Sequence, residues 1–216
     1  MNPKVKICCI SSVEEARIAI EHGASALGLV AKMPSGPGPI ADDLILDIAR
    51  TVPPPIATFM LTSETAAQAI IAHHRRTLTN TIQIVDELAE GTYEQIKREL
   101  PTIKLVQVIH VIDESSVEEA IRIGASVDAL LLDSGNPKAA IKELGGTGRV
   151  HNWGLSRKIV EQSKVPVFLA GGINADNVKK AVDEVNPFGI DLCSSVRTNG
   201  KLDPYKLSLF FQAINS

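Results

Sequence analysis

Short apolar segments alternate with helical segments along the whole chain, and this rhythm is the strongest constraint on its fold. Eight segments have the character of strands, and each is followed by a segment with helical periodicity or helix-end signals. The strand segments are nearly continuous apolar runs, which is typical of parallel strands covered on both faces. Eight such units in 216 residues favour a single-domain α/β fold over residues 1–216, the (β/α)8 TIM barrel, rather than an open doubly wound sheet.

The boundaries of these units follow from local signals. Ser12 and Glu15 form a capping box, Gly23 stands where the same helix should end, and Ser63 is expected to cap the third helix. The hexapeptide at residues 11–16 recurs at 115–120, half a barrel later. It is either an internal repeat or a chance reuse of the same capping sequence. Strands are expected at 5–10, 26–31, 56–61, 81–85, 104–111, 128–132, 165–170 and 189–193, and helices at 12–22, 41–50, 63–74, 92–100, 116–123, 155–162, 175–184 and 204–215.

Composition excludes several classes of protein. The net charge is −3, so no basic excess favours nucleic acid or an acidic membrane surface as a partner. The chain has only three cysteines, a small and odd number that does not suit a disulfide framework and points to a reducing compartment. The N-terminal segment turns polar at Ser11, and no apolar run reaches the about 18 residues that a membrane helix needs. We therefore expect a cytoplasmic protein, a monomer or a homodimer.

In a barrel of this kind, the active site lies at the carboxyl ends of the strands. Gly171 and Gly172 end the seventh expected strand, and Ser194 and Ser195 follow the eighth. Small residues in these two loops let backbone amides approach a phosphate closely, so a phosphate monoester site is expected there. The alternative is that the glycines only turn the chain and the serines only cap a helix.

Cys8 and Asp133 end the first and sixth expected strands, where a thiol and a carboxyl can face each other across the barrel mouth. A thiolate can act as a base when a nearby cation or helix end lowers its pKa, and a buried carboxyl can act as an acid. Each residue also has a structural explanation, Cys8 as a small buried apolar side chain and Asp133 as a turn or helix cap.

Four motifs together resemble the phosphoribosylanthranilate isomerase family, in order and over the whole chain. They are Lys-Ile-Cys at residues 6–8, Leu-Leu-Asp-Ser at 131–134 followed by Gly-Gly-Thr-Gly at 145–148, the glycine loop within 169–178, and the strand and serines within 187–196. The resemblance implies an Amadori rearrangement of a small phosphorylated aminosugar in tryptophan biosynthesis, with no cofactor and no metal. It makes Asp133 the general acid, Cys8 the general base, and Gly146 a further candidate for substrate binding.

The loops that should receive the anthranilate carboxylate depart from the family pattern. Cys9 replaces the usual glycine after the catalytic cysteine, and residues 33–39 lack the usual arginine. Lys32 is the nearest cation and a candidate substitute, although a lysine lacks the bidentate fork of an arginine.

Further departures follow the fourth and eighth strands. Asp86 should add negative charge near the mouth, and Ser195 and Arg197 stand where the family has glycine and glutamate. Arg197 is a candidate substrate-binding residue, but a solvated surface charge is the preferred interpretation, as it is for the run at residues 73–76. Three functions stay open: a divergent phosphoribosylanthranilate isomerase, an isomerase of another phosphorylated sugar, and a non-catalytic phosphate-ligand binder.

Overall fold

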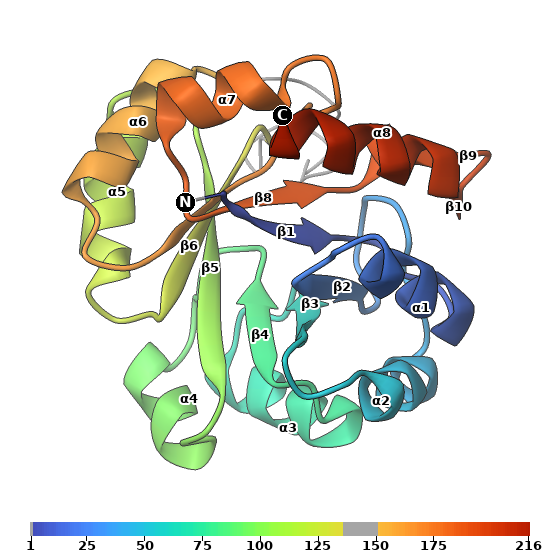
Figure 1. Ribbon diagram of the computed structural model, residues 1–216. Coiled ribbons are helices and arrows are strands. Elements are labelled where there is room, and N and C mark those ends of the chain that lie inside the picture. Colours follow the sequence, from blue (N-terminus) through green and yellow to red (C-terminus); the bar gives the residue numbers. More distant parts are fainter. Residues whose placement is uncertain (1, 136–150) are drawn as a thin grey trace.

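Strands β1 to β8 pair in sequence order, and β1 pairs with β8 to close the barrel in this computed structural model, which describes residues 2–135 and 151–216. Every pairing around the barrel is parallel, and the helices form a ring outside it (Figure 1). The predicted (β/α)8 fold is confirmed. The strands are β1 Lys4–Ile7, β2 Ala26–Val30, β3 Ala57–Thr62, β4 Thr81–Ile84, β5 Lys104–His110, β6 Ala129–Asp133, β7 Val167–Leu169 and β8 Gly189–Leu192.

Buried apolar side chains form two shells, one between strands and helices and one inside the barrel. In β6, Leu130 and Leu132 belong to the outer shell, whereas Ala129 and Leu131 belong to the inner one. Both faces of the strand are therefore covered, which explains its continuous apolar sequence. The helices are α1 Val13–Glu21, α2 Asp42–Thr51, α3 Ala67–Thr77, α4 Tyr93–Glu99, α5 Ser115–Gly124, α6 Trp153–Gln162, α7 Val178–Val185 and α8 Pro204–Asn215.

The segment after β8 adds a short 3₁₀ turn, η1 Ser194–Val196, and a small antiparallel hairpin. Strands β9 Arg197–Thr198 and β10 Lys201–Leu202 form this hairpin, which lies beside the N-terminal end of α8 in Figure 1. This segment was expected only as a connection, because its strands are two residues long and carry no periodicity.

The predicted capping box begins α1. The Oγ of Ser12 accepts a hydrogen bond from the Glu15 amide at 3.1 Å, and a Glu15 carboxylate oxygen accepts one from the Ser11 amide at 2.9 Å. The repeated hexapeptide folds differently at α5. There Ser116 lies inside the helix, and its Oγ accepts from the Ile112 amide at 3.0 Å. The same sequence therefore makes two different local structures.

The prediction that Ser63 caps α3 is wrong. The helix begins at Ala67, and its cap position, Ala66, makes no side-chain cap bond. The Ala67 amide instead donates to the Glu90 carbonyl at 2.8 Å, in the segment after β4. A neighbouring loop thus satisfies the first turn of α3, and sequence periodicity carries no sign of such a contact.

The expectation of a solvated end at residues 73–76 is also wrong for its two histidines. His73 lies between Asp42 and Thr62, with its Nε2 3.0 Å from the Asp42 carboxylate. His74 has its Nε2 2.7 Å from the Thr79 carbonyl. Both residues are buried, so they tie α3 to its surroundings. No helix within the described ranges is long and apolar enough to span a membrane.

We expect Ser12→Ala to destabilise the protein by about 1 kcal/mol, because the first turn of α1 loses its side-chain acceptor. Ser63→Ala is the matched control and should leave stability within about 0.5 kcal/mol, since Ser63 caps nothing. Urea denaturation curves of the two variants measure both changes. Equal losses would contradict this assignment of the caps.

Candidate active site

A cavity of about 290 Å³ opens at the carboxyl ends of the barrel strands. Its size suits a small ligand. This one cavity brings together six of the nine predicted site residues. The six are Cys8, Asp133, Gly171, Gly172, Ser194 and Ser195.

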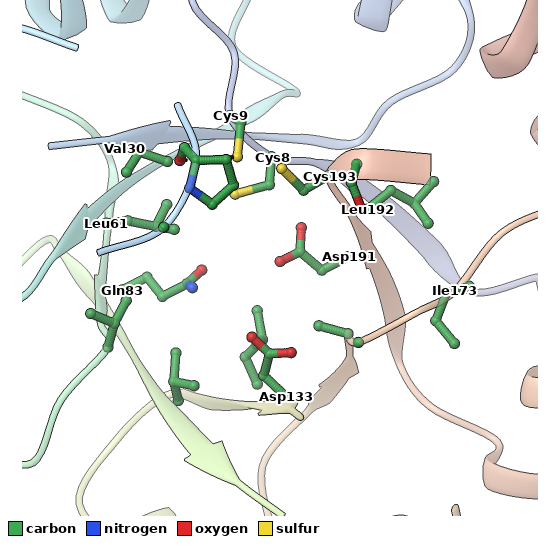
Figure 2. Close-up of a pocket in the computed structure, with 18 of the residues that line it drawn as sticks. Cys8, Cys9, Val30, Leu61, Gln83, Asp133, Ile173, Asp191, Leu192 and Cys193 are labelled. Atoms are coloured by element: carbon green, nitrogen blue, oxygen red, sulfur yellow. Dashed lines mark hydrogen bonds between the residues drawn. The ribbon is translucent and has the colours of Figure 1, made fainter. Parts of the chain in front are cut away.

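Cys8 directly follows β1 and is held by the last strand. Its amide donates to the Leu192 carbonyl at 2.7 Å, and its side chain is buried. Figure 2 shows the sulfurs of Cys8, Cys9 and Cys193 beside one another at the edge of the cavity. All three are free thiols.

Cys9 has a left-handed backbone, with φ of 62°, a conformation in which glycine meets no steric penalty. Its side chain nevertheless packs closely against the loop after β2. A Cβ placed on Gly38 would lie 2.6 Å from the Cβ of Cys9, and the Cys9 thiol donates to the Pro37 carbonyl at 3.6 Å. The side chain at position 9 therefore fits into a gap that a glycine in the opposite loop leaves open.

The thiols of Cys8 and Cys9 differ in acidity. The hydrogen bond from Cys9 lowers the pKa of Cys8 against the effect of burial, and the charge of Lys6 lowers it further. Hydrogen bonds to Cys193 and Cys8, together with burial, raise the pKa of Cys9. Of the two thiols, Cys8 is therefore the one that loses its proton more easily.

Asp133 ends β6 across the cavity from Cys8. One of its carboxylate oxygens accepts from the Ser134 amide at 2.7 Å, and the residue is 7% exposed. Figure 2 shows the carboxylates of Asp133 and Asp191 turned toward the same open space as the Cys8 sulfur. An acid and a base can therefore reach opposite sides of one small molecule.

Sequence reasoning missed Lys6 and Asp191. The Nζ of Lys6 lies 2.9 Å from a carboxylate oxygen of Asp191, and their side chains are 0% and 9% exposed. Asp191 lines the cavity, and Lys6 lies below it inside the barrel. A charged residue within an otherwise apolar strand segment is the signal that could have identified each of them.

Gln83 of β4 was also missed. Its side chain is buried, lines the cavity and points toward its centre in Figure 2. Among the described residues its Oε1 has no hydrogen-bond partner. A buried acceptor of this kind is available to a ligand hydroxyl or amine.

The glycine loop after β7 has a left-handed backbone. Gly171 and Gly172 have φ of 81° and 67°. Glycine adopts such angles without strain, whereas a residue with a side chain would be strained there. Asn177 holds the loop by donating from its Nδ2 to the Gly172 carbonyl at 2.9 Å. The loop is thus fixed beside Ser194 and Ser195, and it adds no side chain that would block backbone amides.

Arg197 is not the solvated surface charge that we expected. Its side chain is 8% exposed, and its guanidinium forms an ion pair with Glu15 at 3.1 Å. It also donates to the carbonyls of Cys8 and Cys9. Arg197 is therefore paired with Glu15 of α1 and holds the backbone at Cys8 and Cys9.

The other predicted residues lie outside the cavity lining or outside the described residues. The side chain of Lys32 is exposed and does not line the cavity, and Asp86 lines another groove, formed with residues of β5 and α5. Gly146 lies outside the described residues. Substrate contacts of Lys32, Gly146 and Arg197 stay predictions. In the described part of the chain, no group of three or more His, Cys, Asp or Glu residues is arranged to hold a metal ion.

The profile of the N-(5'phosphoribosyl)anthranilate (PRA) isomerase family matches residues 5–213. The chain belongs to this family. Among curated relatives, the N-(5'-phosphoribosyl)anthranilate isomerase of Methanosarcina acetivorans is 31% identical, over 98% of this chain and 92% of the relative. Isomerase 2 of Methanosarcina mazei is 32% identical, over 96% of this chain and 92% of the relative.

Solved structures agree with the family assignment. The phosphoribosyl anthranilate isomerase of Thermotoga maritima superposes with a TM-score of 0.81 at 26% identity, covering 99% of this chain and 98% of that one. A phosphoribosyl anthranilate isomerase in complex with reduced 1-(o-carboxyphenylamino)-1-deoxyribulose 5-phosphate superposes with a TM-score of 0.79 at 24% identity, covering 99% and 98%.

We expect Arg197→Met to destabilise the protein by about 3 kcal/mol, because it leaves the buried Glu15 charge and two carbonyls without their partner. Arg17→Met, which removes the exposed ion pair with Glu14, is the matched control and should cost less than about 1 kcal/mol. Denaturant midpoints measure both. The double variant Glu15→Gln, Arg197→Met should recover part of the loss, and a loss that stays additive would contradict this network.

Proposed function

We propose that this chain catalyses the isomerisation of N-(5'-phosphoribosyl)anthranilate to the carboxyphenylamino-deoxyribulose phosphate in tryptophan biosynthesis. The observation that carries this proposal is that a thiol, a carboxyl and a glycine loop line one cavity. Membership of the family supports the same reaction. The reaction is an Amadori rearrangement, in which substrate and product are isomers.

Asp133 acts first, as the general acid. It gives a proton to the ring oxygen of the ribose, the bond between that oxygen and C1 breaks, and C1 becomes an iminium carbon bonded to the anthranilate nitrogen. Asp133 lines the cavity at the end of β6, where its carboxyl can reach the ring oxygen of a bound sugar.

Cys8 then acts as the general base. Its thiolate removes the proton from C2, and the electron pair neutralises the iminium nitrogen to give an enolamine. The enolamine takes a proton at C1 and releases one from the C2 hydroxyl, which yields the ketone. Negative charge on the Cys8 sulfur, favoured by the Cys9 thiol and Lys6, is what this step needs.

The glycine loop and the serines bind the substrate phosphate in this proposal. Gly171 and Gly172 leave space for close approach, and Ser194 and Ser195 supply amides and hydroxyls on the facing loop. Phosphate bound there leaves the sugar between the Cys8 and Asp133 sides of the cavity. Binding by backbone groups requires no lysine or arginine.

One observation favours a second candidate, an isomerase of another phosphorylated sugar. Among the described residues, no lysine, arginine or histidine lines the cavity. The residues from the loop after β2 are Met33, Ser35, Gly36 and Pro37, which offer no charge to the anthranilate carboxylate. Dependence of turnover on that carboxylate separates the two substrates.

We expect Cys8→Ala and Asp133→Asn each to lower kcat at least about 10³-fold, because each removes a proton-transfer group. The fluorescence lost when phosphoribosylanthranilate, made in situ, is consumed gives the rate. Asp183→Asn, on the exposed surface of α7, is the control and should retain full activity. An inactive but folded wild type that still binds ribose phosphates would contradict the proposed substrate.

We expect Ser195→Asp to raise KM and the inhibition constant of inorganic phosphate about tenfold or more, because a carboxylate would repel the phosphate. Ser195→Ala is the matched control and should change both less than about threefold, since the backbone amide remains. Steady-state kinetics with and without phosphate measure these constants. Unchanged inhibition in Ser195→Asp would place the phosphate elsewhere.

A further inference from the structure

A fully buried lysine lies inside the barrel directly below the catalytic cysteine. Lys6 precedes Cys8 by two positions in β1, so both side chains face the barrel interior. The Nζ of Lys6 lies 2.9 Å from the carboxylate of Asp191 and 5.3 Å from the centre of the Phe59 ring. A buried ion pair of this kind contributes little net stability compared with apolar side chains of the same size, so its presence is not explained by packing.

The space beside Gly28 of β2 shows how close the ammonium and the thiol are. A Cβ on Gly28 would lie 2.7 Å from the Sγ of Cys8 and 3.0 Å from the Nζ of Lys6. Both atoms therefore border the same small gap, which the missing side chain leaves open. Charges this close interact strongly because little water separates them.

We propose that the Lys6 ammonium, held in place by Asp191, is the positioning charge that keeps Cys8 in its thiolate form beside the substrate. The role of Cys8 as base rests on the proposed function. The interaction between Lys6 and the thiol does not, and it can be measured on the thiol alone. Lys6 touches no substrate, because it lies below the cavity lining.

The charges around Cys8 act in opposite directions. Its sulfur is faced by the Cys9 thiol and by Lys6, which both favour the thiolate, and by Asp191, which opposes it. Burial disfavours the charge on Lys6, but Asp191, together with Cys8 and Cys9, outweighs burial and raises the pKa of Lys6, so the ammonium persists at neutral pH. Burial raises the pKa of Asp191, Lys6 opposes that shift, and Asp133 adds to it.

This arrangement makes a prediction that a merely structural role does not. Lys6→Met removes the favourable charge and should raise the pH midpoint of Cys8 reactivity by about one unit or more. Asp191→Asn removes the opposing charge, while its amide oxygen can still accept from the Lys6 ammonium, so it should lower that midpoint by about one unit. Both variants break the same ion pair, so a structural role alone would shift the midpoint in the same direction in both.

The rate of Cys8 alkylation by iodoacetamide, measured against pH on the full chain, tests the proposal. Tandem mass spectrometry separates alkylation at Cys8 from that at Cys9 and Cys193. Lys6→Arg is the control and should stay within about half a unit of wild type, because it keeps the charge. Midpoints that move together in Lys6→Met and Asp191→Asn, or that do not move, would overturn the proposal.

The double variant Lys6→Met, Asp191→Asn covers the case in which an unpaired buried carboxylate prevents Lys6→Met from folding. It has neither charge and should still show a higher midpoint than Asp191→Asn alone, and an equal midpoint would overturn the proposal. Opposite shifts in a wild type that does not turn over phosphoribosylanthranilate would support the role of Lys6 while refuting the proposed function. Turnover of phosphoribosylanthranilate without opposite shifts would support the proposed function and refute the role of Lys6.

Discussion

The first strand, β1, closes the barrel by pairing with the last strand, β8, from Lys4 and Gly189 to Ile7 and Leu192. In this register Lys6 lies opposite Asp191, and the Cys8 amide reaches the Leu192 carbonyl. A shift by one residue would turn Lys6 and Cys8 from the interior toward the helices. The closing pair therefore sets the position of the base and of its charged neighbours, and the rest of the site depends on it.

A second clamp fixes the chain where it leaves β1. Cys9 adopts a left-handed backbone at a cost of about 1–2 kcal/mol. Hydrogen bonds from Arg197 to the carbonyls of Cys8 and Cys9 offset this cost, and the capping box residue Glu15 holds Arg197. One carboxylate thus serves both the start of α1 and the shape of the catalytic loop.

The proposed reaction also requires two titrating groups of the cavity to be in opposite states. The base must be ionised and the acid protonated at the same pH, so their surroundings must differ. Cys8 has the Cys9 thiol and the Lys6 ammonium on its side of the cavity, and both lower its pKa, whereas Asp133 lies on the other side, at the end of β6.

Much of this architecture was predictable from the sequence, because it follows from local patterns. The order of strands and helices comes from apolar periodicity, and the glycine loop, Cys8 and Asp133 lie where a barrel of this order places its site. Contacts between distant segments were not predictable. Lys6 and Asp191 are 185 positions apart, and only the closing register joins them.

The failures of sequence reasoning have the same origin. Arg197 is buried because α1 supplies Glu15 as its partner, and α3 begins late because a loop after β4 satisfies its first amide. The glycine at position 38 and the side chain at position 9 fit each other across two loops. In each case the outcome depends on a contact with a residue far away in the chain, which local sequence patterns do not reveal.

A crystal structure of this chain with reduced 1-(o-carboxyphenylamino)-1-deoxyribulose 5-phosphate bound tests most directly whether Cys8 and Asp133 act on opposite sides of one sugar. The account predicts the Cys8 sulfur in contact with C2, the Asp133 carboxyl beside the oxygen that leaves the ring, and the phosphate between the loops of Gly172 and Ser195. A ligand with its phosphate in another loop, or with C2 out of reach of Cys8, would contradict it.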